Sequence, residues 1–181
     1  MSNLKLSVLT EVAIMAALAI ILDNIVLFKM PQGGSVSLTM LPIFILAFRR
    51  GLTAAVTGGL LVGFIQLFFG GYYLSVPQVL LDYILSYGGV GLAGLFYHQF
   101  KTSKNQQMLL LSLGILVGSL ARLLSNVLAG IVFWSDYAPE GTPVWIYSLT
   151  YNASYLVPSA IIALVLLIIL LKVKPSFFQV K

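Results

Sequence analysis

The stretch NVLAGIVFWSDYAPEGTPVWIYSLTYN, residues 126–152, decides the fold class of this chain. An apolar run ends at Trp134, a short acidic loop follows, and a second apolar run carries Tyr147 and Asn152. Two apolar runs joined by a polar loop, with tryptophan beside the loop, are typical of helices that meet at one face of a bilayer. The aromatic rings, together with amides such as Asn126, suit a flat and polar organic molecule. Because no catalytic constellation lies nearby, this stretch predicts a binding site.

The composition of the whole chain supports a lipid environment. Of its 181 residues, 60% are hydrophobic and only 8% are charged, with a mean hydropathy of +1.03. A soluble domain carries about 25% charged residues, so this chain cannot cover a water-facing surface. The absence of cysteine excludes disulfides and thiolate metal sites, and the single His98 excludes a multi-histidine metal site. We therefore expect no metal and no cofactor.

The positions of the basic residues predict the topology. Eight of the ten lie at the termini or in every second loop: Lys5, Arg49, Arg50, Lys101, Lys104, Lys172, Lys174 and Lys181. This is the positive-inside pattern of six spanning helices with both termini cytoplasmic, in a cell membrane, and it argues against nucleic-acid binding despite the net charge of +5. A signal peptide around residues 12–22 is the alternative for the first run, but its removal would leave five spans.

The apolar runs define an all-α integral membrane protein with a single domain, residues 1–181. The expected helices cover about residues 6–28, 38–48, 52–69, 76–97, 108–134 and 144–171. The second helix is short for a bilayer that needs about 20 apolar residues, so it is tilted or the outer loop 29–37 dips into the protein. That loop is rich in glycine and polar residues, which predicts a flexible backbone. Gly59 and Gly63 have the GxxxG spacing of closely packed membrane helices.

Asp82 is the residue whose insertion into the membrane is least favourable, because a carboxylate at the bilayer centre costs roughly 2.5–3.5 kcal/mol of free energy. A structural ion pair with Arg122 is one interpretation. Arg122, however, lies twelve residues inward from Trp134, which is about 18 Å along a helix. We therefore favour a role for Asp82 in the ligand site, where it accepts amino hydrogens or balances a cationic ring.

Other candidate groups have an ordinary structural interpretation as well. Trp134, Trp145 and Tyr147 could form an aromatic belt at the membrane interface without any ligand. Asn126 and Asn152 could bond across helices, as amides in membrane proteins do. Because these residues lie at a similar outer depth to Asp82, a shared pocket and the structural alternatives are about equally well supported.

A second surface is suggested by small residues on the first helix. Ala13, Ala16 and Ala17 give this helix a smooth face, with Ala13 and Ala17 in AxxxA spacing. Small residues allow close helix packing within one protein. The same face could instead receive another membrane protein.

Several segments together resemble a known family. They are VLTEVAIMAALA (8–19), PQGGSVSL (31–38), LPIFILAFRRGLTA (41–54), QVLLDY (78–83), AGIVFWSDYAPEG (129–141) and YSLTYNASY (147–155). In order and spacing they resemble the thiamine-specific substrate-binding (S) component of energy-coupling factor transporters. The resemblance implies a six-helix membrane protein without enzymatic activity that binds thiamine near the outer face. It also implies partners, namely a transmembrane coupling protein and two cytoplasmic ATPases, with Ala13 and Ala17 on the docking surface.

The resemblance assigns ligand contacts to particular positions. The matching residues are Tyr72, Asp82 with the following Tyr83, Trp134, Tyr147 and Asn152. The helix 108–134 departs from the family pattern, since Asn126 stands where histidine is usual, four residues before Gly130. Asn126 keeps a hydrogen-bonding group but removes a flat ring.

The function expected from the sequence is thiamine capture for uptake, and three alternatives remain. The substitution at Asn126 allows a ligand related to thiamine, such as its pyrimidine or thiazole precursor. A stand-alone proton-coupled carrier would also use an intramembrane carboxylate such as Asp82. An intramembrane enzyme would need a second catalytic group at the depth of Asp82, and the sequence offers none.

Overall fold

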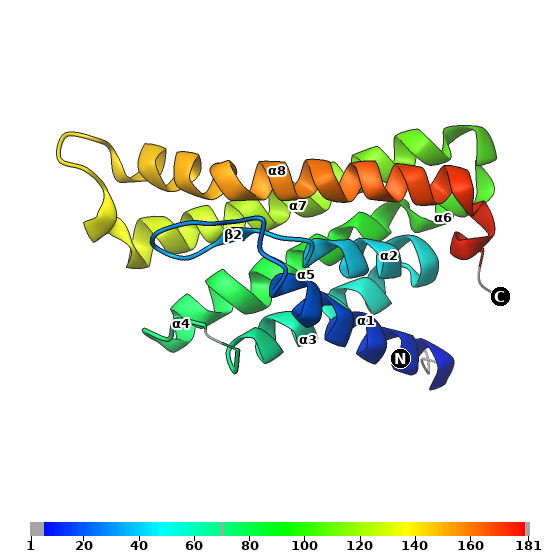
Figure 1. Ribbon diagram of the computed structural model, residues 1–181, viewed down its shortest axis with the longest axis horizontal. Helices are drawn as coiled ribbons and strands as arrows, with labels where there is room; N and C mark the ends of the chain where they lie inside the picture. Colours follow the sequence, from blue (N-terminus) through cyan, green and yellow to red (C-terminus); the bar gives the residue numbers. More distant parts are fainter. Residues whose placement is uncertain (1–5, 70, 180–181) are drawn as a thin grey trace.

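The computed structural model describes residues 6–69 and 71–179 of the chain, which form a bundle of helices (Figure 1). Five helices are separate, and they are α1 (Leu6–Asp23), α2 (Met40–Arg50), α3 (Leu52–Gln66), α7 (Gln107–Phe133) and α8 (Val144–Val173). The remaining one is composite and runs without a break through α4 (Val76–Val79), η1 (Leu80–Leu85), α5 (Ser86–Val90), η2 (Gly91–Phe96) and α6 (Tyr97–Thr102). Short elements complete the chain, namely β1 (Phe28–Lys29), β2 (Ser35–Val36), η3 (Lys104–Gln106), η4 (Ser135–Tyr137) and η5 (Pro175–Phe178).

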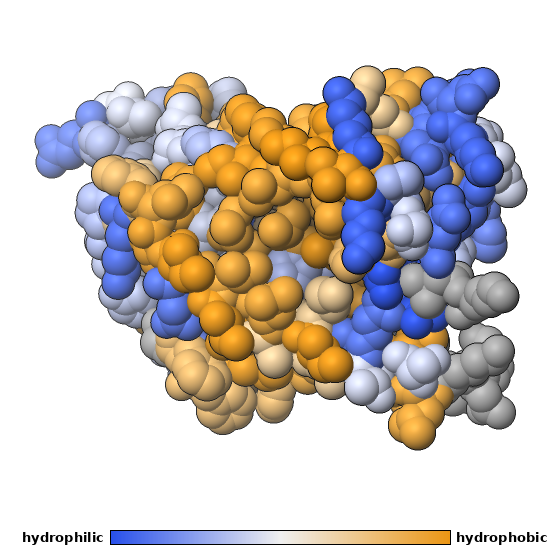
Figure 2. All heavy atoms as spheres, turned by 45° about the vertical axis from the view of Figure 1, so that its right-hand side comes forward, coloured by the Kyte–Doolittle hydropathy of each residue, from blue (hydrophilic) through white to orange (hydrophobic). Residues whose placement is uncertain are grey.

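The predicted all-α membrane fold is confirmed. Four helical segments are long and apolar enough to cross a bilayer, namely Leu6–Asp23, Val76–Thr102, Lys104–Phe133 and Val144–Val173. As the sequence predicted, α2 is short, with 11 residues. The helix α3 has 15 residues and ends at Gln66, three residues before the predicted end. Figure 2 shows the resulting surface, in which a broad apolar band is bordered by polar residues at both ends of the bundle.

Both ends of the described chain lie at one end of the bundle, as predicted (Figure 1). Here Glu11 of α1 forms ion pairs with Arg49 and Arg50 of α2, at 2.5 and 2.6 Å. The element η5 folds back onto the same end, where the ring of Phe178 packs on Phe100 with 5.6 Å between centroids. Because this end carries the basic residues, it is the cytoplasmic end, and the α7–α8 loop marks the outer end.

The GxxxG pair of α3 allows the composite helix to approach closely. A Cβ atom added to Gly59 would collide with the backbone of Tyr87, and one added to Gly63 would collide with the backbone of Tyr83. Only glycine allows this separation between the two backbones. The packing therefore fixes the stretch that carries Asp82 and Tyr83 against α3.

The helix predicted over about residues 76–97 is present, and two of its features were not predicted. The helix continues to Thr102, and its outer part contains a π-helical segment, Leu80–Leu85, followed further inward by the 3₁₀ segment Gly91–Phe96. A π-turn inserts an extra residue into the helix and is frequent at functional sites. Asp82 and Tyr83 lie within this π-turn, so it determines where both side chains point.

The outer loop is also more ordered than predicted. The first helix ends at Asp23 rather than near Phe28, and the following chain forms an antiparallel hairpin in which Phe28 pairs with Val36. Its turn contains Gly33 and Gly34, with φ of 93° and 83°, values that glycine adopts far more readily than other residues. The loop is therefore a structured element, and Figure 1 shows it lying across the outer half of the bundle.

The small-residue face of α1 differs from the prediction at one position. Ala13 and Ala17 are exposed, whereas Ala16 is only 1% exposed and belongs to the hydrophobic core. Residues three apart lie about 60° from each other around a helix, and here that rotation turns Ala16 from the exposed side of α1 into the core. Ala16 is therefore unavailable as a docking residue, and the exposed face is limited to Ala13 and Ala17.

Candidate functional site

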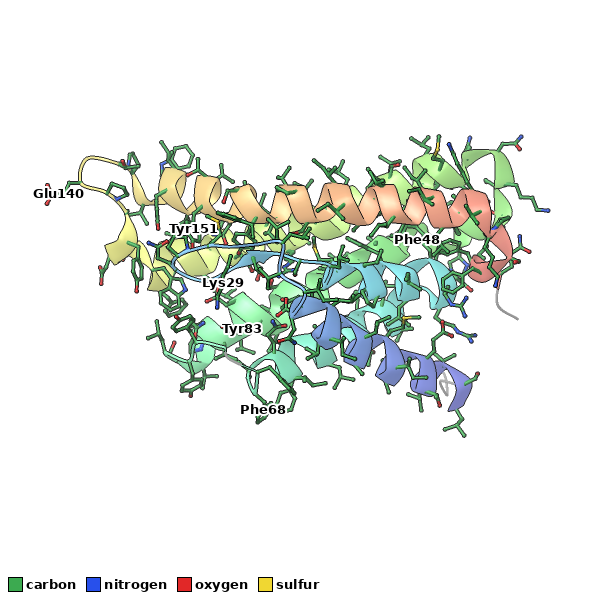
Figure 3. All side chains as sticks on the ribbon, in the orientation of Figure 1. Lys29, Phe48, Phe68, Tyr83, Glu140 and Tyr151 are labelled. Atoms are coloured by element: carbon green, nitrogen blue, oxygen red, sulfur yellow. The ribbon has the colours of Figure 1, made fainter. Side chains whose placement is uncertain are left out.

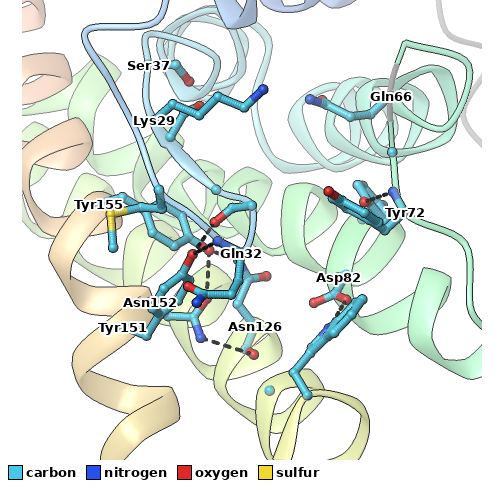
Figure 4. Close-up of a pocket in the computed structure, with 18 of the residues that line it drawn as sticks. Lys29, Gln32, Ser37, Gln66, Tyr72, Asp82, Asn126, Tyr151, Asn152 and Tyr155 are labelled. Carbon is cyan, nitrogen blue, oxygen red and sulfur yellow. Dashed lines mark hydrogen bonds between the residues drawn. The ribbon is translucent and has the colours of Figure 1, made fainter. Parts of the chain in front are cut away.

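A cavity of about 410 Å³ lies in the outer half of the bundle, between the composite helix, α7, α8 and the hairpin. All seven residues expected at the ligand site line it: Tyr72, Asp82, Tyr83, Asn126, Trp134, Tyr147 and Asn152. Figure 4 shows Asp82 and Tyr72 on one side, with Tyr151, Asn152 and Tyr155 on the other. The structure thus brings together residues that are up to 80 positions apart in the sequence. Ligand pockets commonly measure about 300–1,000 Å³, so this cavity can hold a small organic molecule.

Asp82 and Trp134 form one wall of the cavity as a connected unit. The carboxylate oxygen Oδ2 of Asp82 accepts hydrogen bonds from Trp134 Nε1 at 3.0 Å and from Gln78 Nε2 at 2.7 Å. Gln78 is completely buried and in turn accepts a bond from the backbone N–H of Leu74. Among the described residues, no group donates to Asp82 Oδ1. This wall therefore offers an aromatic face and a carboxylate oxygen that is free for a ligand.

Tyr72 and Tyr83 close the neighbouring part of the wall. The hydroxyl oxygen of Tyr83 accepts a hydrogen bond from the backbone N–H of Tyr72 at 2.7 Å. The ring of Tyr72 meets the ring of Trp134 edge to face, with 6.1 Å between the centroids, a favourable aromatic geometry. Tyr72 remains 61% exposed, which places it at the rim rather than at the floor.

The opposite wall is a directed chain of hydrogen bonds. Asn152 Nδ2 donates to the backbone carbonyl of Ser148 at 2.9 Å, and Asn152 Oδ1 accepts from the hydroxyl of Tyr155 at 2.6 Å. The Tyr155 oxygen then accepts from Asn126 Nδ2 at 2.9 Å. Asn126 Oδ1 is buried and has no partner among the described residues. A buried unpaired carbonyl is costly, so this oxygen is a candidate ligand contact.

The hairpin covers this wall from the outside. The hydroxyl of Tyr151 accepts from the backbone N–H of Gln32 at 2.9 Å and donates to the carbonyl of Gly33 at 2.8 Å. A Cβ atom on Gly34 would lie 2.6 Å from the ring of Tyr155, closer than atoms can pack. Glycine is therefore needed where the loop crosses the tyrosine rings, and the loop forms part of the cavity wall.

Several cavity residues were missed by the sequence analysis. Tyr151 and Tyr155 follow Tyr147 at intervals of four residues, a spacing that places all three on one helix face and could have identified them. In Figure 3, Tyr151 of α8 and Tyr83 of the composite helix both lie in the outer half of the bundle, whereas Phe48 lies near the cytoplasmic end. Trp145 is 57% exposed and lies outside the cavity lining, as expected of an aromatic belt.

Asp23 is a second carboxylate of the cavity, and its neighbours could not be read from the sequence. It accepts hydrogen bonds from Ser37 Oγ at 3.2 Å, from Thr39 Oγ1 at 2.5 Å and from Gln66 Nε2. These donors come from two separate segments, the link between β2 and α2 and the helix α3. Since its oxygens already have partners, Asp23 holds the end of α1, the hairpin and α3 together.

Arg122 also lines the cavity but does not pair with Asp82. Neither of the ion pairs among the described residues includes it, so the structural ion pair considered for Asp82 is not formed. Its guanidinium carbon lies 4.1 Å from the ring centroid of Tyr87, a cation–π contact. Within residues 6–69 and 71–179, no group of three or more His, Cys, Asp and Glu side chains could hold a metal ion.

Comparison with known proteins gives consistent matches along most of the chain. The family described as thiamine transporter protein (Thia_YuaJ) matches residues 9–179. The thiamine transporter ThiT of Bacillus subtilis is 45% identical over 179 residues, which cover 94% of this chain and 93% of that protein. ThiT of Lacticaseibacillus paracasei is 34% identical over 186 residues, with 98% and 92% covered.

A solved structure supports the same relationship. ThiT from Listeria monocytogenes superposes with a TM-score of 0.88 at 31% sequence identity, covering 96% of this chain and 98% of that one. The structural similarity therefore extends over nearly the whole chain.

Proposed function

Because this chain belongs to the thiamine transporter family, we propose that its outer cavity binds thiamine as the substrate-binding component of an energy-coupling factor transporter. The chain is a multi-pass bacterial membrane protein, and its relatives are named as transporters rather than enzymes. The observation that carries the proposal is the joint presentation of Trp134 and a free Asp82 oxygen in one cavity wall.

The chemistry of thiamine matches this wall. Its thiazolium ring is a cation, which a carboxylate such as Asp82 attracts strongly in a site of low polarity. Aromatic faces add cation–π attraction of about 0.5–2 kcal/mol, and the cavity offers them at Trp134, Tyr72 and Tyr147. The aminopyrimidine ring is flat and carries hydrogen-bond donors and acceptors, which suit Asn126 and Asn152 on the opposite wall. The cavity therefore provides for both halves of the molecule.

Fluorescence titration of the purified protein with thiamine tests this function. The chain has only two tryptophans, Trp134 and Trp145, so a ligand stacked on Trp134 quenches a large part of the emission. We expect saturable quenching at micromolar thiamine or below. Trp134→Phe removes the quenching, whereas the matched Trp145→Phe, outside the cavity, retains it. Saturable binding of a pyrimidine or thiazole precursor, without a response to thiamine, would establish the precursor as the ligand instead.

The proposed partners are a transmembrane coupling protein and two cytoplasmic ATPases, which would supply the energy for release on the inside. The exposed Ala13 and Ala17 give α1 a smooth surface along the middle of the helix. On the same helix, Glu11 is held by Arg49 and Arg50, so this surface is rigid. Rigid surfaces lose little conformational freedom on association, which suits repeated docking and release.

A bulky substitution tests the docking surface separately from the binding site. Ala13→Trp or Ala17→Trp should abolish thiamine uptake in cells and leave thiamine binding to the purified protein unchanged. The control is Leu120→Trp on α7, a position that is 52% exposed and far from α1 in the bundle. Uptake that survives both alanine substitutions would show that α1 does not form the docking surface.

A further inference from the structure

The π-turn Leu80–Leu85 is held from outside by a side chain that the proposed ligand contacts do not use. Ser125 Oγ of α7 donates a hydrogen bond to the backbone carbonyl of Leu81, with 2.7 Å between the two oxygen atoms. Ser125 is only 8% exposed, and neither Ser125 nor Leu81 belongs to the residues that line the cavity. A ligand in the cavity therefore does not contact this hydroxyl, and any effect of Ser125 on the ligand passes through the π-turn.

The direction of this hydrogen bond differs from the common one. A serine or threonine in a helix often bonds the carbonyl one turn back in its own helix, and Ser112, Thr150 and Ser159 do so in this structure. Ser125 instead crosses from α7 to the composite helix. Inside the hydrocarbon region of a membrane no water replaces a lost donor, so this contact has no ready substitute.

The bonded carbonyl belongs to the peptide unit that precedes Asp82. Because a peptide unit is planar, the hydrogen bond that holds the oxygen of Leu81 also orients the plane attached to the Cα atom of Asp82. The side chain of Asp82 is held separately, since its Oδ2 accepts from Gln78 Nε2 and from Trp134 Nε1. Backbone and carboxylate of this one residue are thus fixed by different groups, and Oδ1 stays available to a ligand.

The π-turn needs such contacts because its place along a helix is not fixed by the helix itself. It contains one residue more than a regular turn, and one residue corresponds to a rotation of about 100° around the helix axis. If the extra residue moved to the other side of Asp82, the side chain of Asp82 would turn by about this angle and leave the cavity wall. The hydrogen bond from Ser125 opposes this shift.

The helix α3 restricts the same turn by packing. A Cβ atom added to Gly63 would collide with the backbone carbonyl of Tyr83, and the backbone N–H of Ser86 donates to this carbonyl at the inner end of the turn. The packing limits how far the turn can move toward α3, but it provides no directed bond to the peptide unit before Asp82. Of the two neighbouring helices, α7 supplies that bond through Ser125.

We propose that Ser125 is a positioning residue, whose hydroxyl fixes the π-turn at the place where the carboxylate of Asp82 faces the cavity. This inference rests on the proposed function, in which Asp82 contacts the ligand. Since the carboxylate is oriented before the ligand arrives, binding does not need to order it, and ordering of side chains is one of the costs of association.

A general link between two packed helices is the other interpretation of this hydrogen bond. Such a link would contribute to stability, and its loss would lower the melting temperature without affecting Asp82. The two interpretations differ at Trp134, whose indole N–H donates to Asp82 Oδ2. If Asp82 turns away, Trp134 loses this partner, and its fluorescence reports the change.

The first measurement is the emission spectrum of the purified protein without ligand. In a Trp145→Phe background Trp134 is the sole tryptophan. Ser125→Ala should shift its emission maximum in the same direction as Asp82→Ala, which removes the partner of the indole outright. Ser119→Ala is the matched control and should leave the spectrum unchanged, since Ser119 Oγ on α7 is buried, has no partner among the described residues and lies outside the cavity lining. An unchanged spectrum in Ser125→Ala would overturn the inference.

The second measurement is a double-mutant cycle on thiamine affinity, determined by isothermal titration. Ser125→Ala should weaken binding by about 2- to 12-fold, which corresponds to the net 0.5–1.5 kcal/mol of one hydrogen bond. In an Asp82→Asn background the same substitution should weaken binding much less, because the contact that Ser125 positions is already lost. An equal effect of Ser125→Ala in both backgrounds would show that it does not act through Asp82. If Ser125→Ala does not fold, Ser125→Cys replaces it in both measurements, since a thiol is a weak donor.

The outcomes separate this inference from the proposed function. A wild-type protein that binds thiamine, with an unchanged Trp134 spectrum in Ser125→Ala, removes the inference alone. A wild-type protein that does not bind thiamine removes the proposed function, and a shifted spectrum in its Ser125→Ala variant would still support the positioning of Asp82 by Ser125.

Discussion

The substitution Asp82→Asn separates the role of the carboxylate in ligand binding from its role in the fold. In the structure both donors, Gln78 Nε2 and Trp134 Nε1, bond to Oδ2. An asparagine can place its single oxygen at the same point and keep both bonds. Its NH₂ group then takes the place of Oδ1, so an acceptor that faces the cavity becomes a donor. The fold and the position of Trp134 are retained while the ligand contact is lost.

The size of the effect follows from the kind of contact removed. A hydrogen bond to a charged group is worth about 1.5–3 kcal/mol, and each 1.4 kcal/mol corresponds to about a tenfold change in affinity. Asp82→Asn should therefore weaken thiamine binding by about 10- to 150-fold. Tryptophan quenching measures this directly, because Trp134 keeps its place in the wall.

The control for this experiment is a second carboxylate at the outer end. Asp136→Asn removes one negative charge from an exposed residue that does not line the cavity. If attraction of a cation to the outer surface as a whole were the cause, both substitutions would weaken binding equally. That outcome, or an Asp82→Asn protein with wild-type affinity and an intact fold, would refute the direct contact.

Three further substitutions test how the cavity is built. Tyr151→Phe removes both hydrogen bonds to the hairpin, worth about 0.5–1.5 kcal/mol each, and should speed backbone hydrogen exchange in the loop and thiamine dissociation; unchanged exchange would show that the hairpin is held by other contacts. Gln78→Leu leaves Asp82 with one donor fewer, so thiamine affinity should fall several-fold in titration, and equal affinity would contradict the connected wall. Gly63→Leu forces side-chain atoms against the backbone of Tyr83 and should lower the melting temperature of the detergent-solubilised protein by several degrees, whereas an unchanged melting temperature would show that α3 can shift.

The helices and much of the cavity were predictable from the sequence because they depend on local patterns. Apolar runs and the distribution of basic residues identified the spans. Asp82, Asn126 and Asn152 could be recognised because polar side chains are conspicuous inside apolar runs. Their common depth then followed from the rise of a helix, and the structure brings them to one cavity.

Features that depend on contacts between distant segments were not predictable. The hairpin is ordered by Tyr151, 118 positions away from Gly33. Asp23 ends α1, and its donor Gln66 lies 43 positions further along the chain. The π-turn around Asp82 has no sequence signal, because nothing in LLDYIL distinguishes it from an α-helix. The burial of Ala16 is of the same kind, because it depends on how α2 and α3 pack against α1.

The central claim is that thiamine occupies the outer cavity, and a structure of the protein determined with bound thiamine tests it most directly. We predict one thiamine molecule between the two walls, with a ring stacked on Trp134 and a polar or cationic group within hydrogen-bond distance of Asp82 Oδ1. Thiamine bound at another place, or a cavity that stays empty at saturating thiamine, would contradict the claim.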